Sequence, residues 1–224
     1  PIFDDEMVLA GAFGVEKPGK VTASGAPVLR FIMDVRMTNS LFQTLEGDLA
    51  SIAAGPAYLR AVILPHEIAL FSAEDLISSF YLVRLPAHWH RYFAFRTPLS
   101  ARELGLDWDG DAYLASVVLP MGFSCATGFM QAWHRHLALH PPRSLREWHA
   151  GLPAYVEVRG DRPFPLSAAD GERSGWSIYI DDFLEMAVLK DWVATMREGM
   201  IGSHQGTLRM SYDGEGVPRN EEKA

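Results

Sequence analysis

Apolar residues alternate with polar ones in several short stretches of the chain, a pattern typical of half-buried β-strands. Residues 11–35 contain two β-capable stretches, around Val15 and over residues 29–35, separated by a tip rich in Gly, Pro, Ser and Lys. This arrangement predicts a β-hairpin. The other predicted strands cover residues 68–76, with the strand ending at Asp75, and residues 91–95, 113–120 and 176–180.

Other stretches place apolar residues at helical spacing. From Ser124 onward, one face of a predicted helix carries Ala126, Met130, Trp133 and Leu137. This helix is expected to end before Pro141-Pro142. Further helices are predicted over residues 41–64, with a break at Gly55-Pro56, from Ser78 onward, and over residues 184–198 and 204–213.

Residues 141–175 are rich in Pro, Gly and charged residues, so we expect an irregular insertion with one short strand over residues 154–158. The polar stretch at residues 107–111 predicts a surface turn. The mixed order of strands and helices indicates an α+β fold, in which an antiparallel sheet is backed by helices.

The composition is ordinary for a globular protein: 48% of the 224 residues are apolar and 21% are charged. No apolar run approaches the roughly 20 residues needed to cross a membrane, and no signal peptide is visible, so we expect no membrane partner. The single cysteine, Cys125, excludes an internal disulfide and suits a reducing compartment. We therefore expect an intracellular protein, cytoplasmic or nuclear, in which Cys125 is a small buried hydrophobic residue.

Three carboxylates follow predicted strands. The stretch IYIDDF (178–183) contains Asp181 and Asp182, and Asp75 follows the largely apolar stretch 68–73. Neighbouring carboxylates repel each other and lose hydration, so two interpretations stay open: a strand that ends at a solvated turn, or a divalent metal that offsets the repulsion. If the strands carrying Asp75 and Asp181 are neighbours, the three carboxylates converge and could hold two Mg²⁺ ions about 3.5–4 Å apart.

Six short motifs occur in the order found in the fingers and palm of reverse transcriptases, and the sequence resembles this family over roughly residues 11–224. The motifs are LRFIMDVRMTN (29–39), FSAEDLISSFYLVRLP (71–86), YFAF (92–95), LPMGFSCATGFMQ (119–131), YIDD (179–182) and GVPRNEEK (216–223). The resemblance implies a right-hand polymerase fold, with an N-terminal segment and fingers over residues 1–66 and a palm over residues 67–224. The palm would include fingers-like strands at about 86–120 and the insertion at 141–175, and the thumb is expected to lie outside these residues.

The resemblance implies that Asp75, Asp181 and Asp182 bind two Mg²⁺ ions, which Mn²⁺ could replace, with the carbonyl of Leu76 as a further ligand. One metal would lower the pKa of the attacking hydroxyl, and the other would hold the triphosphate and its leaving group. Lys223 resembles the family's late lysine, which can donate a proton to pyrophosphate. The alternative for Lys223 is a solvated charge beside two glutamates.

Other positions are implied to contact the nucleotide. The backbone amides of Ser78 and Ser79 would face the triphosphate; the alternative is an ordinary helix start, which binds anions in any case. Phe80 would lie beneath the incoming sugar and exclude a ribose 2′-OH, and its alternative is a core aromatic. The remaining implied contacts are Arg30 and Lys17 or Lys20 from the hairpin, Met121 and Gly122 of the Leu-Pro-x-Gly loop, Gln131 near the template, and Tyr179 of the Tyr-x-Asp-Asp motif.

Some positions have an alternative role or depart from the family's pattern. Lys17 and Lys20 could equally form a solvated hairpin tip, and Asp34 and Arg36 are expected to support the fingers by pairing. Met121 stands where many retroviral members have Gln, which puts the contact with the sugar in doubt. Ala126-Thr127 replaces the common Ser-Pro at the head of the helix. These departures and the long insertion are more similar to a retrotransposon polymerase than to a retroviral one.

We therefore expect template-directed DNA synthesis from deoxynucleoside triphosphates on an RNA template, and on DNA as well, by the polymerase domain of a retrotransposon-like element. The alternative is a silent or decayed polymerase-like scaffold that binds nucleic acid or protein. An RNA-templated RNA polymerase is a third option, against which Phe80 argues. The expected partners are an RNA or DNA template with its primer strand and further polyprotein domains: a thumb, an RNase H, and an integrase or recombinase.

The net charge of −8, from 20 basic and 28 acidic residues, disfavours tight nucleic-acid binding by these residues alone. We expect the flanking domains to supply basic charge, and this segment alone to extend a primer poorly. A zinc site is not expected, because the pairs His136 and His140, and His88 and His90, lack a third ligand at metal spacing.

Overall fold

The computed structural model describes residues 2–3, 6–65, 67–143, 150–165 and 174–189. The chain divides into two compact units, one made of residues 1–45 and 80–126 and the other of residues 46–79 and 127–224. Each unit therefore combines two separate stretches of sequence. The division into fingers over residues 1–66 and palm over residues 67–224 stays a prediction.

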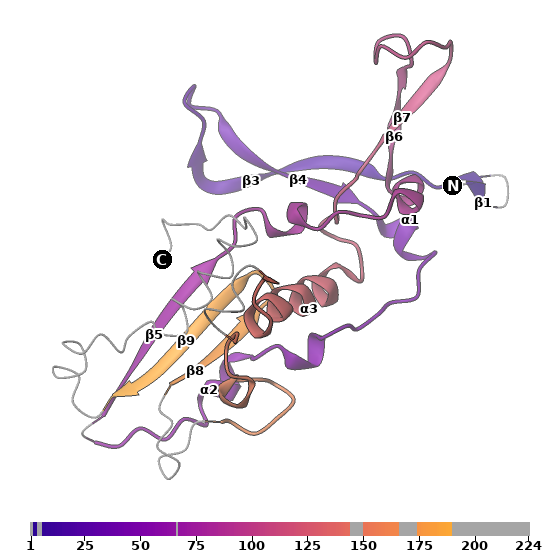
Figure 1. Cartoon of the computed structure of the whole chain (residues 1–224). Helices are drawn as coiled ribbons and strands as arrows, with labels where there is room; N and C mark the ends of the chain where they lie inside the picture. Colours follow the sequence, from indigo (N-terminus) through magenta and orange to yellow (C-terminus); the bar gives the residue numbers. More distant parts are fainter. Residues whose placement is uncertain (1, 4–5, 66, 144–149, 166–173, 190–224) are drawn as a thin grey trace. The chain divides into compact units, whose positions relative to one another are not determined.

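Two long β-hairpins belong to the first unit, which also contains the short antiparallel pair of β1 (Ile2–Phe3) with β2 (Glu6–Met7) (Figure 1). β3 (Gly11–Val21) pairs antiparallel with β4 (Pro27–Asp34), and the register places Gly11 opposite Asp34. This confirms the hairpin predicted over residues 11–35. β6 (Ala94–Ser100) pairs antiparallel with β7 (Asp111–Ala115), and the polar stretch at 107–111 covers the end of their connection and the first residue of β7.

An aromatic cluster forms a core in the first unit. The ring of Phe42 lies 5.2–6.2 Å from four other aromatic rings, those of Trp89, Tyr92, Phe93 and Phe123. Phe93 and Phe123 are buried. Cys125 is buried as well, and its sulfur accepts a hydrogen bond from the backbone N–H of Leu45 at 3.3 Å. The prediction of Cys125 as a small buried residue is confirmed.

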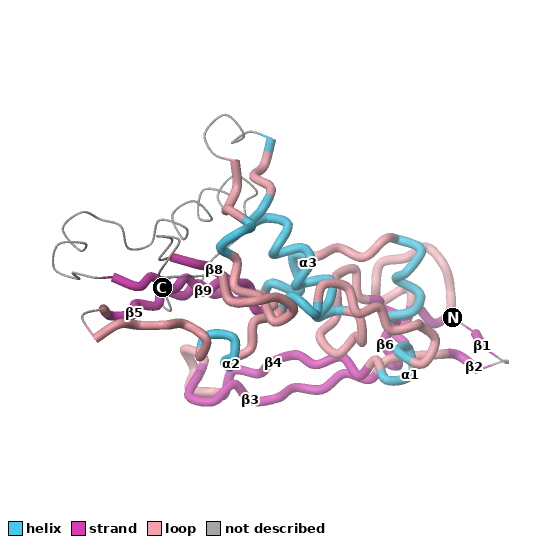
Figure 2. Tube along the Cα trace, turned by 90° about the horizontal axis from the view of Figure 1, so that it is seen from below, coloured by secondary structure: helices cyan, strands magenta, loops and turns pink. Residues whose placement is uncertain are grey.

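A three-stranded antiparallel sheet in the order β5–β9–β8 lies in the second unit, with the three strands side by side in Figures 1 and 2. Its strands are β5 (Ile68–Asp75), β8 (Ser174–Tyr179) and β9 (Asp182–Leu189). β5 ends at Asp75, as predicted. Trp176, Ile178 and Phe183 are buried, and the rings of Trp176 and Phe183 stack with centroids 6.5 Å apart.

Helix α3 (Ala126–Leu139) is the longest helix among the described residues. It begins two residues after Ser124 and ends before Pro141-Pro142, close to the predicted bounds. The remaining helices and strands are short: β1 (Ile2–Phe3), β2 (Glu6–Met7), α1 (Arg36–Asn39), α2 (Gly55–Tyr58), and 3₁₀ turns at Leu49–Ser51, Ser79–Leu82, Ala87–Phe93 and Ala154–Val156. The predicted α+β class with an antiparallel sheet is confirmed.

The helix predicted over residues 41–64 is wrong. This stretch contains only a 3₁₀ turn and the single turn of α2. Two glycines explain why residues 46–47 are not helical. Gly47 has a φ of +55°, and a Cβ on Gly128 of α3 would lie 2.6 Å from the carbonyl oxygen of Glu46. The chain at residues 46–47 thus passes against α3 in a conformation that a helix cannot adopt.

The helix predicted over residues 184–198 is also wrong where the structure describes it, because residues 182–189 form β9. As the central strand, β9 is buried at Phe183 and from Glu185 to Val188. A strand covered on both faces loses the alternation that identifies strands, so its sequence reads like a helix. The rest of this prediction, and the helix predicted over residues 204–213, lie outside the described residues.

Other predicted bounds differ by smaller amounts. Residues 154–158 contain a 3₁₀ turn in place of the expected strand, with a single bridge from Glu157 to Trp176. The helix expected from Ser78 is a 3₁₀ turn of four residues. A 3₁₀ turn also occupies most of the strand expected over residues 91–95, and β7 ends five residues before the expected 120.

Candidate active site

The register of the sheet places two of the predicted metal-binding carboxylates opposite each other. Asp75, the last residue of β5, is the partner of Asp182, the first residue of β9, and Tyr179 of β8 is the partner of Asp182 on the other side. Directly opposed residues share a face of an antiparallel sheet, with Cβ atoms roughly 4.5–5.5 Å apart. Asp182 and Tyr179 are exposed and Asp75 is half-buried, so these side chains stand on an accessible part of the sheet edge.

The two residues between β8 and β9, Ile180 and Asp181, form a tight turn with an unusual backbone. Ile180 has a φ of +59°, and Ser78 has a φ of +53°; among the described residues, no other non-glycine residue has a positive φ. A left-handed conformation is unfavourable for a β-branched residue such as Ile180. Ile180 precedes Asp181 directly and Ser78 lies three residues after Asp75; backbone strain is often part of a functional site.

Two side chains of α3 hold the Ile180 peptide groups. The side-chain oxygen of Gln131 accepts a hydrogen bond from the Ile180 N–H at 2.7 Å, and Nδ1 of His134 lies 2.9 Å from the Ile180 carbonyl oxygen. The side-chain nitrogen of Gln131 also donates to the Ile178 carbonyl at 3.0 Å and to the Ser51 hydroxyl at 2.9 Å. Gln131 and His134 are fully buried.

The geometry gives Gln131 a structural role beside the predicted one. Its amide is buried, and both of its polar atoms bind groups within the same unit, so it supports the turn. Its place near a template stays a prediction. The sequence could have indicated His134, because Gln131 and His134 lie three residues apart on one helix and therefore share a face. Burial lowers the pKa of His134 to about 4, and its bond to the Ile180 carbonyl opposes this shift.

Asp181 is tied to the segment that follows β5. Its carbonyl oxygen accepts a hydrogen bond from the N–H of Leu76 at 3.2 Å, and Oγ of Ser79 lies 3.5 Å from its Oδ2, at the outer limit for donation. Leu76 and Ser79 are buried. The turn and the end of β5 are thus connected by backbone and side-chain contacts as well as by strand pairing.

The oxygen donors of this edge are of the kind that Mg²⁺ prefers. Two carboxylates share a face and the third lies in the adjoining turn, which fits a hard cation in chemistry. Within the described residues, however, no group of three or more His, Cys, Asp and Glu side chains is placed to hold a metal ion. Metal binding here would therefore require the carboxylates to turn toward one another.

Several other predicted contact residues lie in the first unit. Lys17 and Arg30 are exposed on β3 and β4. Met121 and Gly122 lie in the loop before α3; Gly122 has a φ of +102°, which favours glycine. Asn39 holds this loop, because its side chain donates to the Gly122 carbonyl at 2.9 Å and accepts from the Ser124 N–H at 2.9 Å.

Phe80 is half-buried in the 3₁₀ turn Ser79–Leu82. Ser78, whose backbone amide is predicted to face the triphosphate, is exposed. The roles assigned to Phe80, to the backbone amides of Ser78 and Ser79, and to the carbonyl of Leu76 stay predictions. Lys223 lies outside the described residues.

The pairing of Asp34 and Arg36 is confirmed. The guanidinium of Arg36 donates to both carboxylate oxygens of Asp34, at 2.9 and 2.7 Å, and holds the pKa of Asp34 at about 2.

The rings of His136 and His140 lie 4.6 Å apart with no third ligand in the described part of the chain.

A buried ion cluster, which the sequence analysis missed, joins the insertion to α3. Arg135 donates to both carboxylate oxygens of Glu157, at 2.5 and 2.9 Å, and to Asp48 at 2.7 Å. Arg159 and Arg162 also approach Glu157, at 3.7 and 3.6 Å. The hydrogen bonds that Arg135 donates to Glu157 raise the pKa of Arg135, so this arginine is a permanent cation within the unit.

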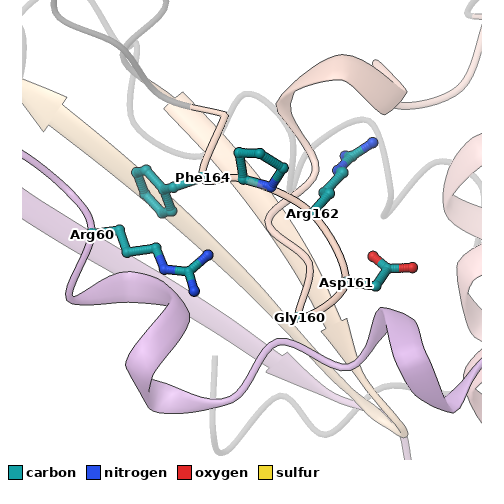
Figure 3. Close-up of a pocket in the computed structure, with 6 residues that line it drawn as sticks. Arg60, Gly160, Asp161, Arg162 and Phe164 are labelled. Carbon is teal, nitrogen blue, oxygen red and sulfur yellow. The ribbon is translucent and has the colours of Figure 1, made fainter.

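A pocket of about 460 Å³ lies elsewhere in the second unit (Figure 3). It is lined by Arg60, Gly160, Asp161, Arg162, Pro163 and Phe164. Phe164 packs against Met186 and Val188. These residues of β9 lie four and six positions beyond Asp182, roughly 13–20 Å along the strand. The pocket is therefore remote from the carboxylate edge.

No family model matches the chain. A segment of 69 residues, 31% of this chain, is 42% identical to the Gag-Pro-Pol polyprotein of human T-cell leukemia virus 3 (strain Pyl43), of which it covers 4%. The chain thus spans only a small part of the curated relative it matches. A structure of the foamy viral protease-reverse transcriptase in complex with double-stranded DNA aligns with 95% of this chain and 26% of that one, with a TM-score of 0.49 and 15% identity.

Among the described residues, no helix is long and apolar enough to cross a membrane. The identity to the polyprotein extends over 69 residues, and the described fold is α+β with antiparallel sheets. The chain is accordingly similar to a region of a retroelement polyprotein.

Proposed function

We propose that this chain forms the fingers and palm of a reverse transcriptase from a retrotransposon-like element. It would synthesise DNA from deoxynucleoside triphosphates on an RNA template, and on DNA as well. The observation that supports this most directly is the opposition of Asp75 and Asp182 at one sheet edge, with Asp181 in the strained turn beside them.

In the proposed reaction the primer 3′-hydroxyl attacks the α-phosphorus of the nucleotide, a new P–O bond forms, and pyrophosphate leaves. Asp75, Asp181 and Asp182 would hold two Mg²⁺ ions, which lower the pKa of the hydroxyl and neutralise the phosphates when bound. The chain's own part would be to hold the backbone that carries these carboxylates, so that their side chains can turn toward one another. The contacts of Gln131, Leu76 and Ser79 with the turn support that role.

The test is primer extension on an RNA template by the protein with its native flanking sequences. Asp75→Asn is expected to lower the rate by at least ~10²-fold, the scale of losing one preorganised charged group. The matched control is Asp107→Asn, an exposed carboxylate in the connection between β6 and β7, which should leave the rate within about twofold.

The same Asp75→Asn change should raise the melting temperature without Mg²⁺, because it removes repulsion between neighbouring carboxylates. Extension near the wild-type rate by this variant would overturn the proposal. A wild-type protein that binds primer–template yet extends nothing with Mg²⁺ or Mn²⁺ would instead favour a polymerase-like scaffold without catalytic activity.

A further inference from the structure

We infer that His134 is a positioning residue for the carboxylate turn: its imidazole N–H holds the carbonyl of Ile180 and thereby sets the direction in which Asp181 and Asp182 point. This inference rests on the proposed function, since it concerns the same site. It adds a residue that lies outside the six sequence motifs and acts through the backbone of the turn.

The chemistry of the contact fixes the tautomer of His134. Its Nδ1 lies 2.9 Å from the Ile180 carbonyl oxygen, and a carbonyl oxygen can only accept a hydrogen bond. Nδ1 must therefore carry the hydrogen. His134 is fully buried, so no water competes for this carbonyl from the side of the ring.

Ile180 needs such a contact because its conformation is unfavourable by itself. A left-handed, β-branched residue persists only when its surroundings hold it. The side-chain oxygen of Gln131 accepts a hydrogen bond from the Ile180 N–H, and Nδ1 of His134 donates one to the Ile180 carbonyl. The two side chains, three residues apart on α3, thus fix both peptide groups flanking this residue.

The carbonyl of Ile180 belongs to the same peptide plane as the N–H of Asp181. If this plane rotates, the Cα–Cβ bond of Asp181 turns with it, and the start of β9 at Asp182 shifts. Removing the imidazole donor should therefore misdirect the carboxylates while the sheet, held by eight pairs between β5 and β9, stays folded.

Two variants separate positioning from packing. His134→Leu fills much of the volume but cannot donate, whereas His134→Asn places an N–H₂ donor near the position of Nδ1. We expect His134→Leu to lower kcat for primer extension at least ~10-fold with the KM for deoxynucleotide within about threefold. His134→Asn should recover kcat to within about threefold of wild type. The control is His136→Asn, an exposed residue on the same helix, which should change neither constant.

A second readout does not depend on activity. Nitrogen NMR of the folded wild type should show the Nδ1–H tautomer at His134, and the backbone amide signals of Asp181 and Asp182 should shift in His134→Leu more than in His134→Asn. The opposite tautomer, or equal loss of kcat in both variants in step with their melting temperatures, would overturn the inference. If the wild type lacks polymerase activity, the proposed function fails, and these signals alone decide whether His134 holds the turn.

Discussion

Some of the side chains that support the sheet edge with Asp75, Asp181 and Asp182 are polar and yet buried. His134 is the clearest case. It is enclosed on α3, and this burial favours its neutral form in the folded protein; the hydrogen bond that it donates to a main-chain carbonyl acts in the opposite direction. Burial lowers its pKa from 6.5 to about 4. An imidazole of this kind makes the free energy of unfolding depend on pH.

The predicted pH dependence has a definite sign. Above pH 6.5 His134 is neutral in both the folded and the unfolded chain, and its contribution to stability is complete. As the pH falls toward 4, His134 becomes protonated in the unfolded chain but stays largely neutral in the folded protein. The free energy of unfolding therefore falls by about 3 kcal/mol. Urea unfolding of wild type and His134→Asn at pH 7, 5.5 and 4.5 measures this loss. An identical pH dependence in the two proteins would contradict the burial of a neutral histidine.

Phe80 gives a prediction about sugar selection that follows from the resemblance to reverse transcriptases. If its ring lies beneath the sugar, Phe80→Val should open space for a ribose 2′-OH and raise ribonucleotide incorporation roughly 5- to 150-fold relative to deoxynucleotide. This range corresponds to relief of ~1–3 kcal/mol of steric overlap. Single-nucleotide extension with matched ribo- and deoxynucleotides measures it. Unchanged discrimination would identify Phe80 as a packing residue, and Met121 would be the next position to test.

At the scale of elements, the ion cluster around Glu157 fastens the insertion to α3. Glu157→Gln removes a buried carboxylate that Arg135 contacts through two nitrogens, and leaves the ion pair of Arg135 with Asp48 in place. We expect the free energy of unfolding to fall by about 1–3 kcal/mol, the scale of losing hydrogen bonds to a charged group. Glu103→Gln, at an exposed position between β6 and β7, is the control and should change it by less than about 0.5 kcal/mol. Denaturant unfolding followed by tryptophan fluorescence provides the measurement.

Local patterns predicted some elements well. The tip rich in Gly and Pro identifies the β3–β4 hairpin, and the apolar stretch before Asp75 identifies β5, because both signals depend on neighbours along the chain. Most of β9 lies in a stretch predicted as a helix, because burial on both faces removes the alternation of apolar and polar residues that identifies a strand. The same limit applies to the candidate site. The three aspartates could be named from motifs, whereas the contacts of His134 and Glu157 arise only when α3 meets the turn and the insertion.

For the whole molecule, the balance of charge predicts weak affinity for nucleic acid. The chain carries 28 acidic and 20 basic residues. Duplex binding relies on phosphate contacts by Lys and Arg and on the release of counterions. We expect the 224 residues by themselves to bind a primer–template with a Kd above about 10 μM at physiological salt. Fluorescence anisotropy with a labelled duplex measures it, and a submicromolar Kd would mean that the basic residues are concentrated on one binding surface.

The unbroken pairing of β5 with β9 has a consequence for how this protein can vary. From Ile68 with Leu189 to Asp75 with Asp182, each residue of β5 has one partner in β9 and the register does not shift. A single inserted or deleted residue in either strand would turn every side chain beyond it to the other face. Asp75 would then leave the face of Asp182, and the buried Phe183 would lose its place in the core. Variants of this protein should therefore differ in the identity of residues within 68–75 and 182–189 but keep the length of both segments.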